Sequence, residues 1–180
     1  MKKYTILGFL LLAFAPLMAQ NLQPDADKSE VKFTIRNFGV NTGGDFKGLK
    51  GSIIFDAGKP AQSSFDVSIE AATVNTDVNS RDNHLRKAEY FDVATYPQIT
   101  FKTDRVTGSN KQGAYFAYGK LTIKGTTKDI SFPFTAAATD EGYTFTGSFE
   151  IDRRDFKIGG NSMVLGDNVK VELIVHTKKK

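Results

Sequence analysis

The side chains whose types and spacing could perform chemistry lie mainly between Thr76 and Phe101. Arg81, Asp82 and His84 follow closely on one another there, and a carboxylate near an imidazole can act as a general acid–base pair. The same groups could instead tie a short helix to its neighbours by charge-assisted hydrogen bonds, or contact the polar end of a ligand. The residue types favour the structural role and leave the other two open.

Other kinds of chemistry find less support. The chain has no Cys and only two His, so it lacks a thiol nucleophile, and a zinc site, which needs three or four ligands, is not expected. No nucleophile-elbow serine motif is present. The glycines near Gly159 and Gly166 lack the Lys-Ser/Thr of a phosphate loop. We therefore expect no catalytic residues, metal or cofactor, and an enzyme that acts on a small amphiphile with Asp82 and His84 as acid–base pair is the alternative.

The charge of the chain argues against nucleic acid as a partner. The formal net charge is +4, and part of it belongs to the two ends of the chain rather than to one clustered basic face, which nucleic-acid binding requires. A second charged group, Asp152, Arg153 and Arg154, stands at the end of a predicted strand. We expect it to form a salt-bridged turn.

The first nineteen residues have the pattern of a secretory signal. Lys2 and Lys3 precede an apolar run from Ile6 to Ala15, and Ala19 supplies a small residue at the expected cleavage point. The run is shorter than the roughly 20 apolar residues of a membrane-spanning helix. We predict a signal peptide over 1–19, cleavage after Ala19, no stable membrane insertion, and a single domain over 20–180 that is periplasmic or secreted.

Alternation of apolar and polar residues predicts about eight strands with one apolar face each. Their approximate ranges are 31–36, 46–55, 65–70, 98–102, 115–123, 130–136, 143–151 and 169–175. Residues 23–28 are interpreted as a polar leader, 41–44 as a loop and 152–168 as a long loop. Successive hairpins without crossover helices favour an antiparallel sheet. We predict an all-β, antiparallel eight-stranded barrel rather than a sandwich, because closure removes exposed edges.

Three local features qualify this pattern. Gly48 and Gly51 suggest bulges or sharp coiling within a strand. Pro133 lies inside an alternating segment, which predicts an unpaired edge or a bulge there. Phe116 and Tyr118 break the alternation of their strand, so either a bulge or a strand with two apolar faces is expected.

One helix interrupts the strands near residues 80–90. Good helix formers run from Arg81 to Ala88, and Asn79 or Ser80 could act as N-cap. A helix of about two turns is not stable alone. It must therefore pack on the barrel, and the end of the barrel is the available place.

A barrel of about eight strands either fills with its own side chains or leaves room for one small ligand. For any single inward Phe, core packing and ligand contact both remain open. Burying ten methylenes contributes about 8 kcal/mol, of which association removes at least about 4 kcal/mol, so micromolar binding of a long apolar molecule needs no strong polar contact. The predicted lining comprises Phe33, Ile35, Phe38, Phe65, Val67, Leu85, Phe91, Ile99, Phe101, Leu121, Phe132, Phe134, Phe145, Phe149, Val171 and Leu173.

Several motifs together resemble the YceI-like family of bacterial exported proteins. They are Thr76-Asp77, Arg81 to Leu85, Tyr90-Phe91-Asp92, Tyr96-Pro97, Ile99 to Phe101, Gly119 to Lys128, Ile151 to Arg153 and Asp155-Phe156. The resemblance implies a lipocalin-like antiparallel barrel with an elongated apolar interior. It also implies a long-chain lipid as partner: a polyisoprenoid, an isoprenoid quinone or another long amphiphile. We therefore expect an exported binding protein that sequesters or carries such a lipid in the barrel interior without catalysis.

The chain departs from the family at one position. Many relatives carry a His before the aromatic-Gly step, where this sequence has Asn37. Any head-group contact at Asn37 is therefore neutral and cannot be switched by pH. We predict that Asn37, Arg81, Asp82 and His84 contact a head group or anchor the helix. A filled barrel with a structural role is a further alternative, and the sequence leaves monomer and homodimer open.

Overall fold

The computed structural model describes residues 19–180, so the signal segment predicted over 1–19 lies, except for Ala19, outside the described residues. The strands are β1 (Gln20–Pro24), β2 (Glu30–Asn37), β3 (Val40–Phe46), β4 (Lys50–Phe55), β5 (Ser64–Glu70), β6 (Gln98–Gly108), β7 (Ala114–Ile123), β8 (Thr126–Ala138), β9 (Tyr143–Asp152) and β10 (Leu165–Lys179). The helices are α1 (Asn79–Leu85) and the short 3-10 turns η1 (Pro60–Gln62), η2 (Ala71–Thr73) and η3 (Arg153–Phe156).

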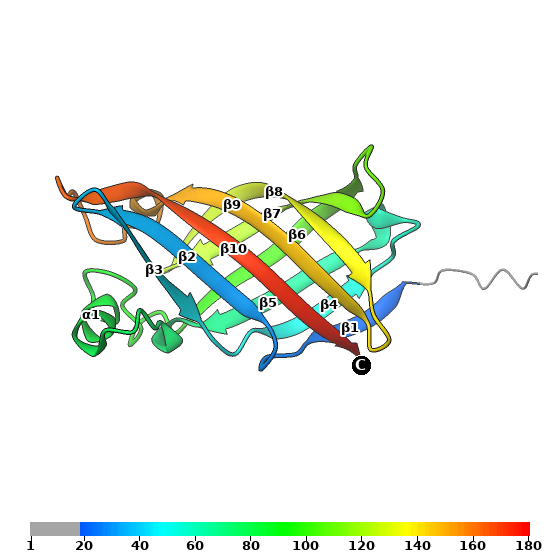
Figure 1. The fold of residues 1–180 in the computed structure, drawn as a ribbon, viewed down its shortest axis with the longest axis horizontal. Coiled ribbons are helices and arrows are strands. Elements are labelled where there is room, and N and C mark those ends of the chain that lie inside the picture. Colours follow the sequence, from blue (N-terminus) through cyan, green and yellow to red (C-terminus); the bar gives the residue numbers. More distant parts are fainter. Residues whose placement is uncertain (1–18) are drawn as a thin grey trace, which may run out of the picture.

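The strands form one closed antiparallel sheet, shown in Figure 1. The long strand β10 pairs with β9 on one side, and with β2 and then β1 on the other. β1 and β2 lie one after the other along the same side of β10, and β4 and β3 pair with β1 and β2 in turn. β1 with β2, and β3 with β4, therefore each act as one interrupted strand. The wall therefore has eight strand positions, which confirms the predicted lipocalin-like barrel with one short helix. In residues 19–180, no helix is long and apolar enough to cross a membrane.

Two strands, β1 and β3, were not predicted from the sequence. β1 ends inside the supposed polar leader over 23–28, and its Leu22 is fully buried between β4 and β10. The supposed loop over 41–44 lies inside β3, and the predicted strand 46–55 is broken after Phe46. Gly44 is needed in β3 because a Cβ there would lie 2.6 Å from the Phe33 ring and 2.5 Å from the Asn75 carbonyl oxygen. A glycine pair that suggests a loop thus permits close packing within a strand.

Strand pairing explains two of the local features noted in the sequence, the broken alternation near Phe116 and the position of Pro133. β7 keeps a strict alternation, with Phe116 and Tyr118 on the outer face. The bulge lies in β6, where the register shifts between Thr103 and Arg105. β7 therefore has no bulge of its own and carries apolar side chains on both faces, as the second alternative predicted. The β8–β9 ladder ends at the Phe134–Gly147 pair, just before Pro133, as the missing N–H of that proline predicted.

The helix α1 is shorter and begins earlier than predicted. It covers Asn79–Leu85 with Val78 as N-cap, and no side chain caps it there. Predicted N-cap residues Asn79 and Ser80 lie inside the helix, because the Asp82 carboxylate holds the preceding segment by bonding to Thr76. The residues after Leu85 continue as turns up to β6.

An aromatic cluster fills the end of the barrel away from α1. Phe55 is 1% exposed and makes ring contacts with Tyr115, Tyr143 and Phe145 at centroid distances of 5.2, 4.9 and 5.0 Å. Phe134 stacks on Tyr115 at 5.4 Å. Such edge-to-face and stacked rings pack densely, so this end of the interior is closed by side chains.

Candidate ligand-binding cavity

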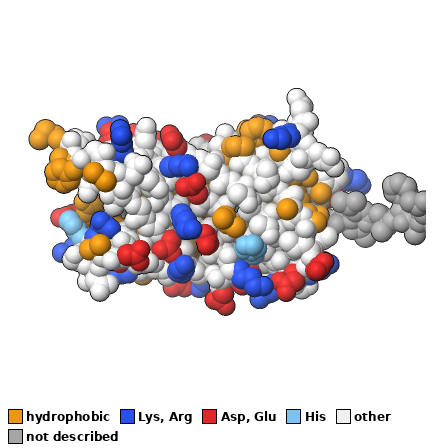
Figure 2. Space-filling view, in the orientation of Figure 1, with side chains coloured by type: hydrophobic (Ala, Val, Ile, Leu, Met, Phe, Trp, Pro, Cys, Tyr) orange, Lys and Arg blue, Asp and Glu red, His pale blue; other side chains and the backbone are white. Residues whose placement is uncertain are grey.

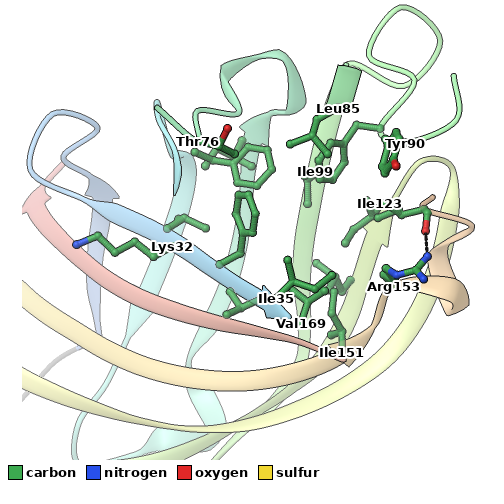
Figure 3. A pocket seen from close by; sticks show the side chains of 18 of the residues that line it. Lys32, Ile35, Thr76, Leu85, Tyr90, Ile99, Ile123, Ile151, Arg153 and Val169 are labelled. Atoms are coloured by element: carbon green, nitrogen blue, oxygen red, sulfur yellow. Dashed lines mark hydrogen bonds between the residues drawn. The ribbon is translucent and has the colours of Figure 1, made fainter. Parts of the chain in front are cut away.

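A cavity of about 410 Å³ occupies the remaining part of the barrel interior. It extends from the α1 end to Val175, whose strand partner Phe145 belongs to the aromatic cluster. Figure 3 shows side chains from several strands and from the α1 region converging on it. Its volume falls within the roughly 300–1,000 Å³ of small-molecule sites.

The lining is formed by alternate residues of the strands. Along β2, Val31, Phe33 and Ile35 face inward, and along β10 so do Val171 and Leu173. These five side chains are only half-buried although they point into the barrel. A packed core would have covered them, so their remaining accessible surface is that of the cavity.

Most of the predicted lining residues border the cavity. These are Phe33, Ile35, Val67, Leu85, Phe91, Ile99, Phe101, Leu121, Phe132, Phe149, Val171 and Leu173.

Four of the predicted lining residues lie elsewhere. Phe38 is 74% exposed, because it occupies the two-residue β2–β3 turn and its side chain points outward. Phe65, Phe134 and Phe145 face inward but pack within the aromatic cluster, with Phe65 at ring distances of 5.5 and 5.7 Å from the other two. Inward parity identified them correctly as interior residues but could not tell which part of the interior is filled.

Other lining residues were not predicted from the sequence. Ile123, Ile151 and Val169 share the inward parity of predicted strands and could have been included on that ground. Tyr90 and Ser162 come from irregular segments, for which no periodic signal exists. Only the tertiary arrangement brings those segments to the mouth.

Arg81 and Asp82 anchor α1 through Thr76. The Asp82 Oδ1 atom accepts hydrogen bonds from the backbone N–H and the hydroxyl of Thr76, at 2.9 and 2.5 Å. Arg81 donates from Nε to the Thr76 hydroxyl and from Nη2 to its carbonyl, both at 2.8 Å. Asp82 is buried, whereas Arg81 borders the cavity. These bonds tie α1 to the segment that precedes it.

His84 makes a separate set of contacts at the mouth. Its Nε2 atom lies 3.0 Å from Glu89 Oε2, and its ring stands edge-on to Tyr90 at 4.9 Å. Both His84 and Asn37 border the cavity. Since Asp82 is bonded to Thr76, the two members of the hypothetical acid–base pair have different partners. Residues 19–180 contain no group of three His, Asp or Glu arranged to hold a metal ion.

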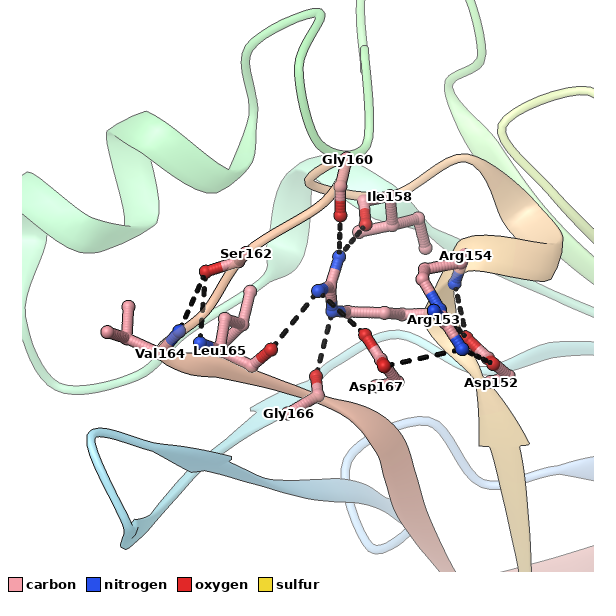
Figure 4. A network of polar contacts seen from close by, with 10 residues as sticks. All are labelled: Asp152, Arg153, Arg154, Ile158, Gly160, Ser162, Val164, Leu165, Gly166 and Asp167. Atoms are coloured by element: carbon pink, nitrogen blue, oxygen red, sulfur yellow. Dashed lines mark hydrogen bonds and ion pairs between the residues drawn. The ribbon is translucent and has the colours of Figure 1, made fainter.

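Arg153 organises the segment between β9 and β10 from the inside. This side chain is 2% exposed and borders the cavity. It donates to the carbonyl oxygens of Ile158, Gly160, Leu165 and Gly166 and to Asp167 Oδ1, at distances of 2.6–3.2 Å (Figure 4). All five N–H donors of the guanidinium are thereby used. The predicted salt-bridged turn is thus mainly a buried arginine that fixes a loop.

The neighbouring Arg154 forms the exposed part of this network. Its Nη2 lies 2.8 Å from Asp152 Oδ2 and 3.3 Å from Asp167 Oδ2. The hydrogen bond from Arg154 lowers the pKa of the Asp152 carboxyl below its usual value and raises the pKa of the guanidinium. Both charged forms are therefore favoured in the fold.

Fold and cavity together define a class: closed antiparallel β-barrels with an apolar, ligand-sized interior. Residues 22–177 match the YceI-like domain, and the chain belongs to the YceI-like family. A UPF0312 protein of Photorhabdus laumondii is 31% identical over 180 residues, covering 96% of this chain and 90% of the relative. A UPF0312 protein of Azotobacter vinelandii is 32% identical over 161 residues, covering 84% and 83%.

Solved structures share the architecture. BcnA of Burkholderia cenocepacia superposes with a TM-score of 0.80 at 29% identity, covering 84% of this chain and 98% of BcnA. A YceI protein of Campylobacter jejuni gives 0.68 at 25% identity, with complete coverage of both chains. A polyisoprenoid binding domain of Saccharophagus degradans gives 0.69 at 16% identity, covering 88% and 98%. The last likeness concerns the fold alone.

Proposed function

We propose that this protein binds a long-chain lipid in its barrel and carries or sequesters it without covalent chemistry. The ligand class is a polyisoprenoid, an isoprenoid quinone or a fatty amphiphile. The observation that carries the proposal is the row of inward apolar side chains, such as Phe33, Val171 and Leu173, left half-buried around a cavity. The Saccharophagus degradans domain, which shares the fold, is named as a polyisoprenoid binding domain.

The polar groups at the mouth fit a binding role. Arg81 and Asn37 border the cavity, where a ligand head group would sit. Asp82 and His84 bond to different partners, Thr76 and Glu89, which supports a binding protein over an acid–base enzyme. The chain's own residues thus enclose an apolar tail and leave its polar end near the solvent.

Export is part of the proposal. The Lys2–Ala19 pattern is that of a secretory signal, so we expect the working protein to begin at Gln20 and to be periplasmic or secreted. Mass spectrometry of the protein recovered from the producing cell and its medium tests this. A chain that retains residues 1–19 and stays with the cytoplasmic fraction would contradict it.

Extraction of the exported protein with organic solvent, followed by mass spectrometry, tests lipid binding. We expect a long-chain lipid in near-stoichiometric amount, or uptake of an added isoprenoid quinone by protein that was stripped first. An empty extract together with no uptake of quinones or polyprenyl lipids would reject the proposal. Turnover of an amphiphile that disappears in His84→Ala, with the fold intact, would favour the enzyme instead.

A further inference from the structure

The open end of the barrel carries an exposed apolar patch on two neighbouring loop tips. We call it the mouth patch and define it by Phe38, Val40, Met163 and Val164, which are 74%, 66%, 103% and 41% exposed. The Phe38 N–H donates to the Val164 carbonyl at 2.8 Å, so the tips are joined. Figure 2 shows hydrophobic side chains gathered at this end of the molecule.

The fold itself does not account for an aromatic residue at the tip. Phe38 and Gly39 have φ values of 50° and 78°, which is the two-residue turn that favours Asn-Gly. A bulky side chain at positive φ is unfavourable, and exposure of its ring is unfavourable as well. Phe38 is thus unfavourable for stability both in its backbone conformation and in its exposed ring, which indicates that the residue serves a function.

The mouth patch is continuous with the cavity wall. Val164 belongs to the patch and also borders the cavity. Asn37 and Ser162, which adjoin the patch in sequence, border the cavity as well. Arg153 holds the 158–167 segment in place from within through its bonds to backbone carbonyls. An apolar surface thus leads from the tips into the barrel, supported by a rigid base.

The tips contain no charged residue. Segments 37–44 and 158–166 consist only of Asn, Ser, Thr, Gly and apolar residues. Placing them at the boundary between head groups and acyl chains therefore desolvates no ionised side chain, and such boundaries are bound through buried apolar area. The described chain ends lie at the other end of the barrel, clear of this face (Figure 1).

We propose that the mouth patch docks shallowly on a lipid bilayer, with the cavity mouth facing the acyl chains. The benefit of this placement rests on the proposed function, because a long-chain lipid must leave or enter a membrane at the cavity mouth. The docking itself is a separate property, and it needs no anionic lipid because the tips are uncharged. It is peripheral, since only the loop tips enter the interface.

The absence of Trp from the chain allows a direct test. Phe38→Trp introduces one fluorophore in the patch, and Phe116→Trp introduces one on the outer wall near the aromatic cluster, where Phe116 is 37% exposed. With phosphatidylcholine vesicles, we expect a blue shift and quenching by brominated acyl chains for Phe38→Trp only. Unchanged emission with excess vesicles would overturn the proposal. A blue shift that appears on concentrating the protein without vesicles would also overturn it, by showing that a second copy covers the patch.

A loss-of-binding pair complements the fluorescence. Phe38→Asn with Met163→Asn should lower vesicle partitioning in a flotation assay about tenfold or more, given the apolar area removed. Asn also suits the positive φ of position 38. The control Phe116→Thr should float like the parent protein. A lipid extract without flotation overturns docking alone, whereas flotation with an empty extract and no uptake overturns the proposed cavity function alone.

Discussion

Phe132 stacks on Phe149 with ring centroids 4.8 Å apart, at the point where β8 and β9 separate. The ladder ends at the Phe134–Gly147 pair, and the two rings occupy the next same-face positions in the same register. Phe156 of η3 packs in the neighbouring cluster with a 1% exposed side chain. Side chains therefore complete this part of the cavity wall where backbone pairing has stopped.

One end of the barrel is filled with rings and the other holds the cavity, so Phe→Ala substitutions at the two ends should destabilise the protein by different amounts. Phe55→Ala should lower the free energy of unfolding by about 3–5 kcal/mol, since it empties a densely packed site. Phe149→Ala should cost about 1–2 kcal/mol, because the ring is half-buried and already borders a cavity. Urea denaturation measures both. Equal losses would mean that the cavity end is packed as tightly as the aromatic cluster.

The cavity predicts opposite behaviour for two adjacent residues of β10. Leu173→Trp points into the cavity and should abolish or strongly reduce lipid uptake, while destabilising by less than the ~1–3 kcal/mol of an overpacked core. Ile174→Trp lies on the outer face and should leave uptake unchanged. Quinone titration and thermal unfolding of both variants check this. Full uptake by Leu173→Trp would place the ligand elsewhere.

Because Arg153 is buried and Arg154 is exposed, substitution of Arg153 should destabilise the fold much more than substitution of Arg154. Arg153→Met should lower the free energy of unfolding by about 3–5 kcal/mol, because it leaves the backbone carbonyls of Ile158, Gly160, Leu165 and Gly166 without their buried donor. Hydrogen exchange should speed up over residues 158–167. Arg154→Met, on the exposed side of the network, should have a much smaller effect. Similar losses in both variants would contradict the role given to Arg153.

The Asp152–Arg154 pair predicts a pH-dependent contribution to stability. Since the folded-state pKa of Asp152 is lowered, the carboxylate stabilises the fold above its unfolded pKa of about 3.9. This contribution disappears as the pH falls through the lower folded value. The stability difference between the parent and Asp152→Asn should therefore be constant from about pH 7 to 5 and shrink below about pH 4. A difference that grows in acid would show the opposite sign of shift.

The sequence by itself determined the fold class and the interior faces of most strands. Alternation along segments such as Val169–Val175 is a local property of the chain, since successive side chains point to opposite faces of a sheet. The Thr76–Phe101 stretch likewise predicted a helix tied down by Arg81 and Asp82. These features needed only local chemistry. The structure confirmed the barrel, whereas α1 begins and ends earlier than predicted.

The tertiary structure decided what depends on distant partners. Gly44 belongs to a strand because it pairs with Phe33 of β2, whose ring takes the space that a Cβ would need. Likewise, β1 is a strand because β4 and β10 flank it. Phe145 and Phe149 have the same inward parity, yet one fills the closed end and the other borders the cavity. Whether a side chain points inward is set within its own strand. Whether the interior around it is packed depends on how many rings from different strands meet at the same level of the barrel. That meeting is fixed only when the sheet closes.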